Sequence, residues 1–141
     1  MQFYINADLD AAILMQWVID WCAENGLGTE LEEQAHRTEL RCPRFALSRD
    51  ADPDDAQSRR EFAEYLRRDY GVTVSTAADL DGQLYSSCSD AQFADLIGYL
   101  LGKFGGDFFL WGEFDAWILC RKNGAISVAD DWKELFSGLN I

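Results

Sequence analysis

Three short apolar runs separated by turn residues constrain the fold of this chain more than any other feature. The runs are Phe108 to Trp111, Ala116 to Arg121 and Ala125 to Val128. Asn123-Gly124 separates the second run from the third, and both residues tolerate the positive φ angles of a tight hairpin turn. The last third of the chain is therefore predicted to contain an antiparallel meander.

Apolar residues recur at helical spacing in several other segments. The first such segment follows a short strand predicted for Gln2 to Asn6, and its stripe consists of Ile13, Leu14, Trp17, Val18, Trp21 and Cys22. The second ends at Gly71 and directs toward the core Phe62, Leu66 and Tyr70. The third contains Phe93, Leu96, Ile97, Leu100, Leu101 and Phe104. A short last helix carries Trp132, Leu135 and Phe136, and both tryptophans of the first helix are predicted to belong to the core.

The middle of the chain has weaker patterns. Thr29 with Glu32 fits the capping box of a short helix, and Glu39 to Leu47 resembles an edge strand interrupted by Pro43. Val72 to Thr76 is β-branched and predicts a strand, after which Ala77 to Gly82 reads as a polar loop. Taken together, the patterns predict one α+β domain over residues 1–141. Its antiparallel sheet is expected to have about five strands, with about four helices packed mainly on one face.

Length and composition agree with a self-sufficient globular domain. A chain of 141 residues buries roughly two-thirds of its unfolded surface, and 48% of these residues are hydrophobic. No apolar run approaches the roughly 20 residues that a membrane span needs. The N-terminal segment lacks the basic and apolar regions of a signal peptide, which predicts a cytoplasmic protein.

The charge balance is strongly acidic. Asp and Glu number 25 against 12 Lys and Arg, which gives a net charge of -13. This charge repels phosphate backbones and anionic lipids, so we expect no direct binding to nucleic acid or membranes. Two interpretations remain open: the charge only keeps the protein soluble, or it attracts a basic partner. The second interpretation requires the carboxylates to gather on one face.

No metal or cofactor is predicted. The four cysteines lie in separate segments with only His36 to assist them, which is unlike a zinc site and fits free, mostly buried thiols. Asp50, Asp52, Asp54 and Glu61 occupy liganding positions of a calcium-binding loop, but Asp55 stands where that loop needs glycine. Capping of the following helix explains the same acidic residues more simply.

The sequence offers no strong catalytic motif, and we do not expect an enzyme. G-x-S-x-G and H-E-x-x-H are absent, and the glycines of Gly102 to Asp107 follow a helix where a phosphate-binding loop would open one. Glu113 and Asp115 are spaced so that they could act as acid and base on a sugar. Carboxylates at a hairpin tip are ordinarily solvated, which is the simpler interpretation.

One resemblance concerns the segment from Gln92 to Trp132. Here an apolar helix is followed by F-L-W-G-E-F-D-A-W-I-L-C-R-K-N-G-A-I-S-V and a tryptophan near the end. This pattern resembles the small immunity proteins of bacterial polymorphic-toxin systems, including the Sit-type toxin-exchange group. The family strand of the type D-A-V-L-L aligns with Asp115, Ala116, Ile118 and Leu119, whereas Trp111 and Trp117 have no counterpart in the pattern.

The resemblance implies a protein that binds one cognate toxin domain and blocks its active site or substrate surface. A basic toxin surface would be steered toward carboxylates that surround an aromatic anchor. The residues expected to bind this partner are Asp79, Asp81, Asp107, Trp111, Glu113 and Asp115. Two alternatives remain: an acidic mimic of nucleic acid that inhibits a DNA- or RNA-processing enzyme, and a small hydrolase or transferase.

Overall fold

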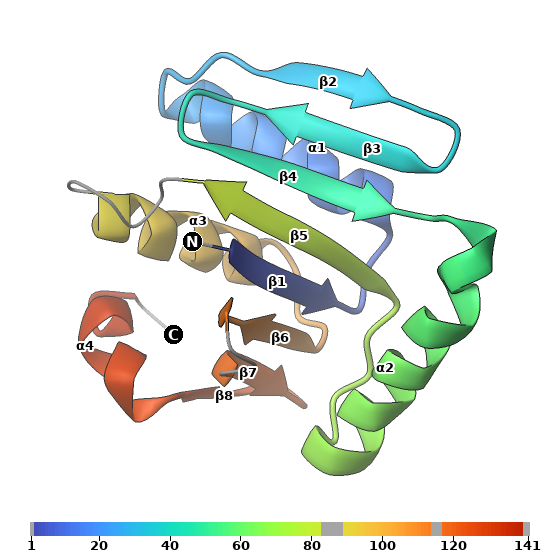
Figure 1. The fold of residues 1–141 in the computed structure, drawn as a ribbon. Coiled ribbons are helices and arrows are strands. Elements are labelled where there is room, and N and C mark those ends of the chain that lie inside the picture. The colour runs from blue at the N-terminus through green and yellow to red at the C-terminus, as the bar shows by residue number, and fades with distance from the viewer. Residues whose placement is uncertain (1, 83–88, 114–116, 140–141) are drawn as a thin grey trace.

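The body of the protein is one antiparallel sheet of eight strands, in a computed structural model that describes residues 2–82, 89–113 and 117–139 (Figure 1). The strand order is β2-β3-β4-β5-β1-β6-β7-β8. The strands are β1 (Gln2–Ala7), β2 (Glu30–Glu33), β3 (Arg37–Arg41), β4 (Phe45–Asp50), β5 (Thr76–Gly82), β6 (Phe108–Trp111), β7 (Trp117–Lys122) and β8 (Ala125–Val128). The expectation of about five strands is therefore wrong.

Four α-helices pack on the two faces of this sheet within the described residues. Helices α1 (Ala11–Glu24) and α3 (Ser89–Lys103) cover one face, and the short helix α4 (Lys133–Phe136) joins the same core through Phe136. Helix α2 (Ala56–Tyr70) packs on the opposite face, where Leu66 contacts Phe109 and Trp111. Figure 1 shows α2 apart from the other helices, at the end of the sheet away from β2. The domain thus has one large core and a smaller second core under α2.

Helix α1 follows its predicted stripe with one exception. The Asp10 side chain accepts a hydrogen bond from Ala12 N at its start, and Gly26 adopts φ 70° just beyond its end. Leu27 N donates to Cys22 O at 2.8 Å, which closes the last turn as the sequence predicts. Trp21 is fully buried, whereas Ile13, predicted to face the core, is exposed.

The segment between α1 and α2 is a β-meander. The capping box predicted for Thr29 and Glu32 is wrong, because Glu30–Glu33 is the fully exposed edge strand β2. The strand predicted for Glu39 to Leu47 is divided into β3 and β4, with Pro43 in the turn between them. Leu40 and Leu47 pair across these two strands and are buried under the helices.

The strand and the loop predicted after α2 are also corrected. Val72 to Ser75 forms no strand, and the predicted loop is instead the central strand β5. Its residues alternate: Ala78 and Leu80 are buried in the large core, while Ala77, Asp79 and Asp81 point to the other face. The polar composition of this segment reflects a strand with only one buried face.

The predicted C-terminal meander is confirmed for β6, β7 and β8. Asn123 and Gly124 have φ 50° and 82°, as the tight hairpin between β7 and β8 requires. The pairing of β6 with β7 shifts register between Leu110 and Trp111. Simple alternation predicts Trp117 with Leu119 on one face and Ile118 with Cys120 on the other. Because of the irregularity, Trp117 and Cys120 pack in the smaller core while Ile118 and Leu119 lie in the large one.

The free thiols of the described residues lie in or beside these cores. Cys22 and Cys42 meet where α1 ends beside the turn from β3 to β4. A hydrogen bond between the two thiols lowers the pKa of Cys42 to about 6 and raises the pKa of Cys22.

None of the described helices is long and apolar enough to cross a lipid bilayer.

Candidate binding site on the open face

Helix α2 covers only one end of its side of the sheet and leaves the other end uncovered. We call the uncovered surface, formed by the outward side chains of β2, β3, β4 and β5, the open face. Cross-strand pairing fixes its composition, because directly paired residues point to the same side. Its carboxylates are Glu30, Glu32, Glu39, Asp50, Asp79 and Asp81, and the arginines among them are Arg37 and Arg41.

One cross-strand row connects the edge of the sheet to the smaller core. The successive partners in this row are Glu32, Glu39, Ser48, Asp79, Tyr4 and Trp111. Neighbouring strands lie about 4.8 Å apart, so these side chains form one continuous line across six strands. The row begins with exposed Glu32 and half-buried Glu39, and it ends with exposed Tyr4 and buried Trp111.

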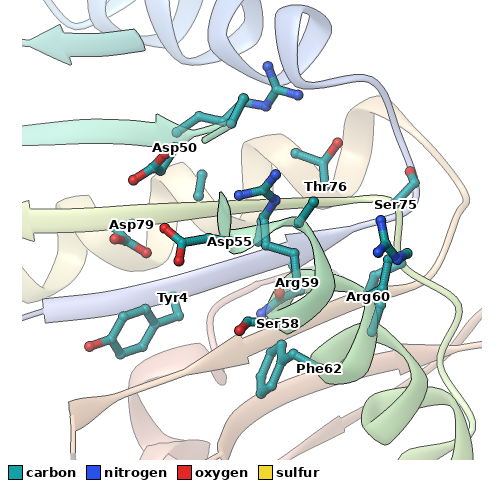
Figure 2. Close-up of a pocket in the computed structure, with 18 of the residues that line it drawn as sticks. Tyr4, Asp50, Asp55, Ser58, Arg59, Arg60, Phe62, Ser75, Thr76 and Asp79 are labelled. Atoms are coloured by element: carbon teal, nitrogen blue, oxygen red, sulfur yellow. The ribbon is translucent and has the colours of Figure 1, made fainter. Parts of the chain in front are cut away.

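A cleft of about 790 Å³ lies where this row passes beneath α2. Its floor is formed by β4, β5 and β1, and its wall is the first half of α2 with the turn before it. Figure 2 shows Tyr4 and Asp79 on the sheet and Ser58, Arg59 and Phe62 on α2, all bordering the same space. A volume of this size accommodates a small molecule or several residues of a peptide.

The cleft contains opposite charges that do not neutralise one another directly. Asp50 and Asp79 belong to the sheet, and Arg59 and Arg60 belong to α2. Within the described ranges, no ion pair joins either arginine to a carboxylate. In the view of Figure 2, Asp50 and Asp79 lie toward one end of the cleft and Arg60 toward the other, with Arg59 between them.

Asp79 is the most unusual charged group of the cleft. Its carboxylate is half-buried and makes no hydrogen bond with any other part of the described chain. Burial raises the pKa of Asp79 above its usual range, Asp50 raises it further, and the positive charge of Arg37 lowers it only in part. A desolvated carboxylate without a partner is characteristic of binding sites.

Aromatic side chains line another side of the cleft. Tyr4 is 37% exposed and Phe62 38%, which makes them two of the largest exposed apolar side chains among the described residues. Behind them Trp111 is only 7% exposed, and its ring centroid lies 5.6 Å from that of Phe62. The surface available to a partner is therefore Tyr4 with Phe62, while Trp111 supports them from within the smaller core.

Two residues that line the cleft also carry buried hydrogen-bond donors without a partner in the described chain. Asn6 is only 2% exposed, and its side-chain amide nitrogen has no hydrogen-bond partner in the described chain. The indole nitrogen of Trp111 is likewise buried and unpartnered. Buried polar groups are nearly always hydrogen-bonded in native proteins, so such a pair on one cleft is unusual.

The structure brings together some of the predicted partner-binding residues. Asp79 and Asp81 lie on the open face, and Trp111 ends the row that contains Asp79. Glu113 accepts a hydrogen bond from the backbone nitrogen of Gln2, the strand partner of Asp81, at 2.6 Å. It thus fixes the start of β1 beside the open face.

The remaining predicted residues do not belong to this group. Asp107 lies at the other end of β6 from Trp111, where its carboxylate accepts from Thr73 N at 2.8 Å and from Asn123 N at 3.1 Å. It joins two loops and has a structural role. Asp115 lies outside the described residues, so the acid and base pair proposed for Glu113 and Asp115 is not placed.

The acidic segment before α2 contributes caps. Asp50 accepts from Asp52 N at 2.8 Å, and Asp52 accepts from Asp54 N at 3.0 Å. These are the local bonds expected of residues that begin a helix. Across the described ranges, no three His, Cys, Asp or Glu side chains converge in a way that could hold a metal ion.

Sequence reasoning missed the residues from β1 and α2 that complete the cleft, namely Tyr4, Asn6, Arg59 and Phe62. A signal for two of them exists in β1, because polar or amphipathic Gln2, Tyr4 and Asn6 alternate with buried Phe3, Ile5 and Ala7. Phe62 was assigned to the core by its helical spacing, and no local pattern indicates which end of a sheet a helix leaves uncovered.

Comparison with protein-family models, with curated proteins and with solved structures gives no significant match.

Proposed function

We propose that this chain is an inhibitory binding protein of the immunity-protein kind, which docks its open face on a basic surface of a toxin domain. The observation that carries the proposal is the row of carboxylates leading into the cleft between Tyr4 and Phe62. Carboxylates around exposed aromatic side chains steer a basic partner and then hold it. Six of the 25 acidic residues lie on the open face beside two arginines, so this face carries part of the negative charge that would attract a basic partner.

Two details favour an immunity protein over an acidic mimic of nucleic acid that inhibits a DNA- or RNA-processing enzyme. Arg41 forms an ion pair with Glu39 at 3.0 Å, and Arg37 lies 3.9 Å from the same residue. These arginines lie on either side of Glu39 along β3 and place positive charge among the carboxylates of the open face, whereas a phosphate mimic needs uninterrupted negative charge. The aromatic side chains beside the row also match a protein interface, in which aromatic residues are enriched.

The proposal is tested by co-purification with the C-terminal domain of the protein encoded by the adjacent upstream gene, followed by titration at low and high salt. We expect a stoichiometric complex that is weakened by salt, because attraction between surface charges is screened. Asp81→Lys should slow association at low salt by roughly tenfold or more. Glu24→Lys makes the same charge change at the end of α1, behind the sheet, and should leave the association rate nearly unchanged.

Either of two results would contradict the proposal. One is the absence of a complex. The other is a complex whose association rate responds equally to Asp81→Lys and Glu24→Lys, because the open face would then have no special part in binding.

A further inference from the structure

The cleft differs chemically from the rest of the open face, and its chemistry restricts what can occupy it. The exposed carboxylates of β2 and the half-buried carboxylate of β3 attract any basic surface. The cleft instead offers both signs of charge, with Asp79 on its floor and Arg59 on its wall. A purely cationic occupant would meet the arginines of α2, and a purely anionic one would meet Asp79 and Asp50.

The opposite charges of the cleft are not paired with one another. Arg59 is half-buried, yet in the described part of the chain its guanidinium has no ion-pair partner. Asp79 is half-buried and also forms no ion pair within the described ranges, so the cleft holds two half-buried groups of opposite sign that are not paired with one another. An occupant that carries both charges can satisfy both groups, and charge-assisted hydrogen bonds are the strongest polar contacts available to it.

The body of the occupant must match the apolar end of the cleft. Exposed Tyr4 and Phe62 flank the opening, and aromatic faces bind the long alkyl stem and the cationic end of a lysine or arginine side chain. The cleft is also continuous with the carboxylate row of the open face.

From these features we infer that the cleft binds one peptide segment of the partner, in which a basic side chain reaches Asp79 and a nearby carboxylate reaches Arg59. This inference rests on the proposed function for the origin of the segment. It specifies a contact that the charge of the open face alone does not require.

Selection of displayed short random peptides on the full chain tests this inference without knowledge of the partner. We expect the enriched peptides to contain a basic residue and an acidic residue, or a free C-terminus, only a few positions apart. Asp79→Asn and Arg59→Gln should each lower their affinity by roughly tenfold to a hundredfold, because each removes one charged hydrogen-bonding group.

Matched controls lie outside both the cleft and the open face. Glu24→Gln removes a carboxylate at the end of α1 and Arg67→Gln removes a guanidinium on α2, and neither residue borders the cleft. Both controls should bind the selected peptides as the wild type does. The inference is overturned if no peptide is enriched over a bare surface, or if the cleft variants and the controls bind alike.

The same variants separate this inference from the proposed function. A salt-sensitive complex with the neighbouring toxin domain that tolerates both Asp79→Asn and Arg59→Gln would support docking through the open face and overturn the peptide contact. Failure of that complex, together with cleft-dependent peptide binding, would overturn the immunity function and support the cleft as a peptide site of another partner.

Discussion

Asp79 illustrates how a residue proposed to bind a partner can oppose folding. Its carboxylate is desolvated on the floor of the cleft and faces Asp50 of β4, while Arg37 of β3 compensates only in part. Arg59 of α2 borders the same space without pairing to it. Charged groups of this kind destabilise the free protein and become favourable only when a partner supplies the missing charge.

The direction of the pH dependence follows from the raised pKa of Asp79. Because the folded-state pKa exceeds the unfolded value, the ionised carboxylate destabilises the folded protein, and this penalty is fully present above the folded-state pKa. It disappears as the pH falls through that value. Asp79→Asn should therefore raise the free energy of unfolding at neutral pH, and its advantage should shrink in acid.

Urea unfolding of the wild type and Asp79→Asn at neutral and acidic pH measures this effect. Asp81→Asn changes an exposed residue of the same strand and should alter stability by no more than about 0.5 kcal/mol at either pH. A lower stability of Asp79→Asn at neutral pH would contradict the assignment of Asp79 as a strained binding residue.

At the scale of elements, a buried arginine connects the end of α3 to the meander. Arg121 on β7 donates from Nη1 to Leu101 O and from Nε to Gly106 O, both at 2.8 Å, and lies 4.6 Å above the ring of Phe104. It satisfies backbone carbonyl groups at and beyond the last turn of α3, which a helix leaves without intrahelical partners. Burial lowers the pKa of its guanidinium, and the negative charge of Asp107 opposes that shift.

Removal of this arginine should destabilise the domain substantially. Arg121→Met keeps much of the apolar stem but leaves two carbonyl groups without their donor, at a cost of about 2 to 4 kcal/mol in the free energy of unfolding. Arg121→Lys should recover only part of the loss, because an ammonium group cannot reproduce the planar fork. Thermal and urea unfolding measure both variants.

Arg67→Met on α2 is the matched control for these variants. Arg67 forms only an exposed ion pair with Glu64 at 3.7 Å, and its loss should change stability by less than about 1 kcal/mol. If Arg121→Met were no more destabilising than this control, Arg121 would not be the structural connection that its hydrogen bonds indicate.

The elements also show which parts of the fold are predictable from sequence. The hairpin at Asn123 and Gly124 was predictable because positive φ angles restrict the residues that fit. Helix α1 was predictable because its apolar positions repeat and local bonds define both its ends. In both cases the determining interactions lie within a few residues of one another.

The outer strands were missed because their stability comes from neighbours far away in the sequence. The segment Glu30–Glu33 is polar throughout and becomes a strand only by pairing with β3. Asp79 and Asp81 belong to β5 because Ala78 and Leu80 bury against the helices on the other side. Asp79 and Asp81 were therefore predicted as binding residues but were placed on a loop. The residues of α2 that border the cleft together with Asp79 could not be predicted.

At the scale of the whole molecule, the charges proposed to favour binding also oppose folding. The net charge of -13 is partly concentrated on the open face, where Glu32 and Glu39 are direct cross-strand neighbours. Like charges placed opposite one another destabilise a sheet, and the closest arginine partners of Glu39 relieve this repulsion only locally. Dissolved salt screens such repulsion beyond about 10 Å at 0.1 M.

Salt should consequently act in opposite directions on the free protein and on its complex. Added sodium chloride is expected to raise the Tm of the free chain, because it weakens repulsion among carboxylates, and to lower its affinity for a basic partner, because it weakens attraction. Calorimetry of the free protein and titration of the complex over the same salt series measure the two effects. Replacement of Glu32 by glutamine should reduce both salt dependences together, since one carboxylate contributes to both. If the Tm of the free protein fell with salt, attractive ion pairs would dominate its surface. Repulsion among the carboxylates of the open face would then not be what a partner relieves.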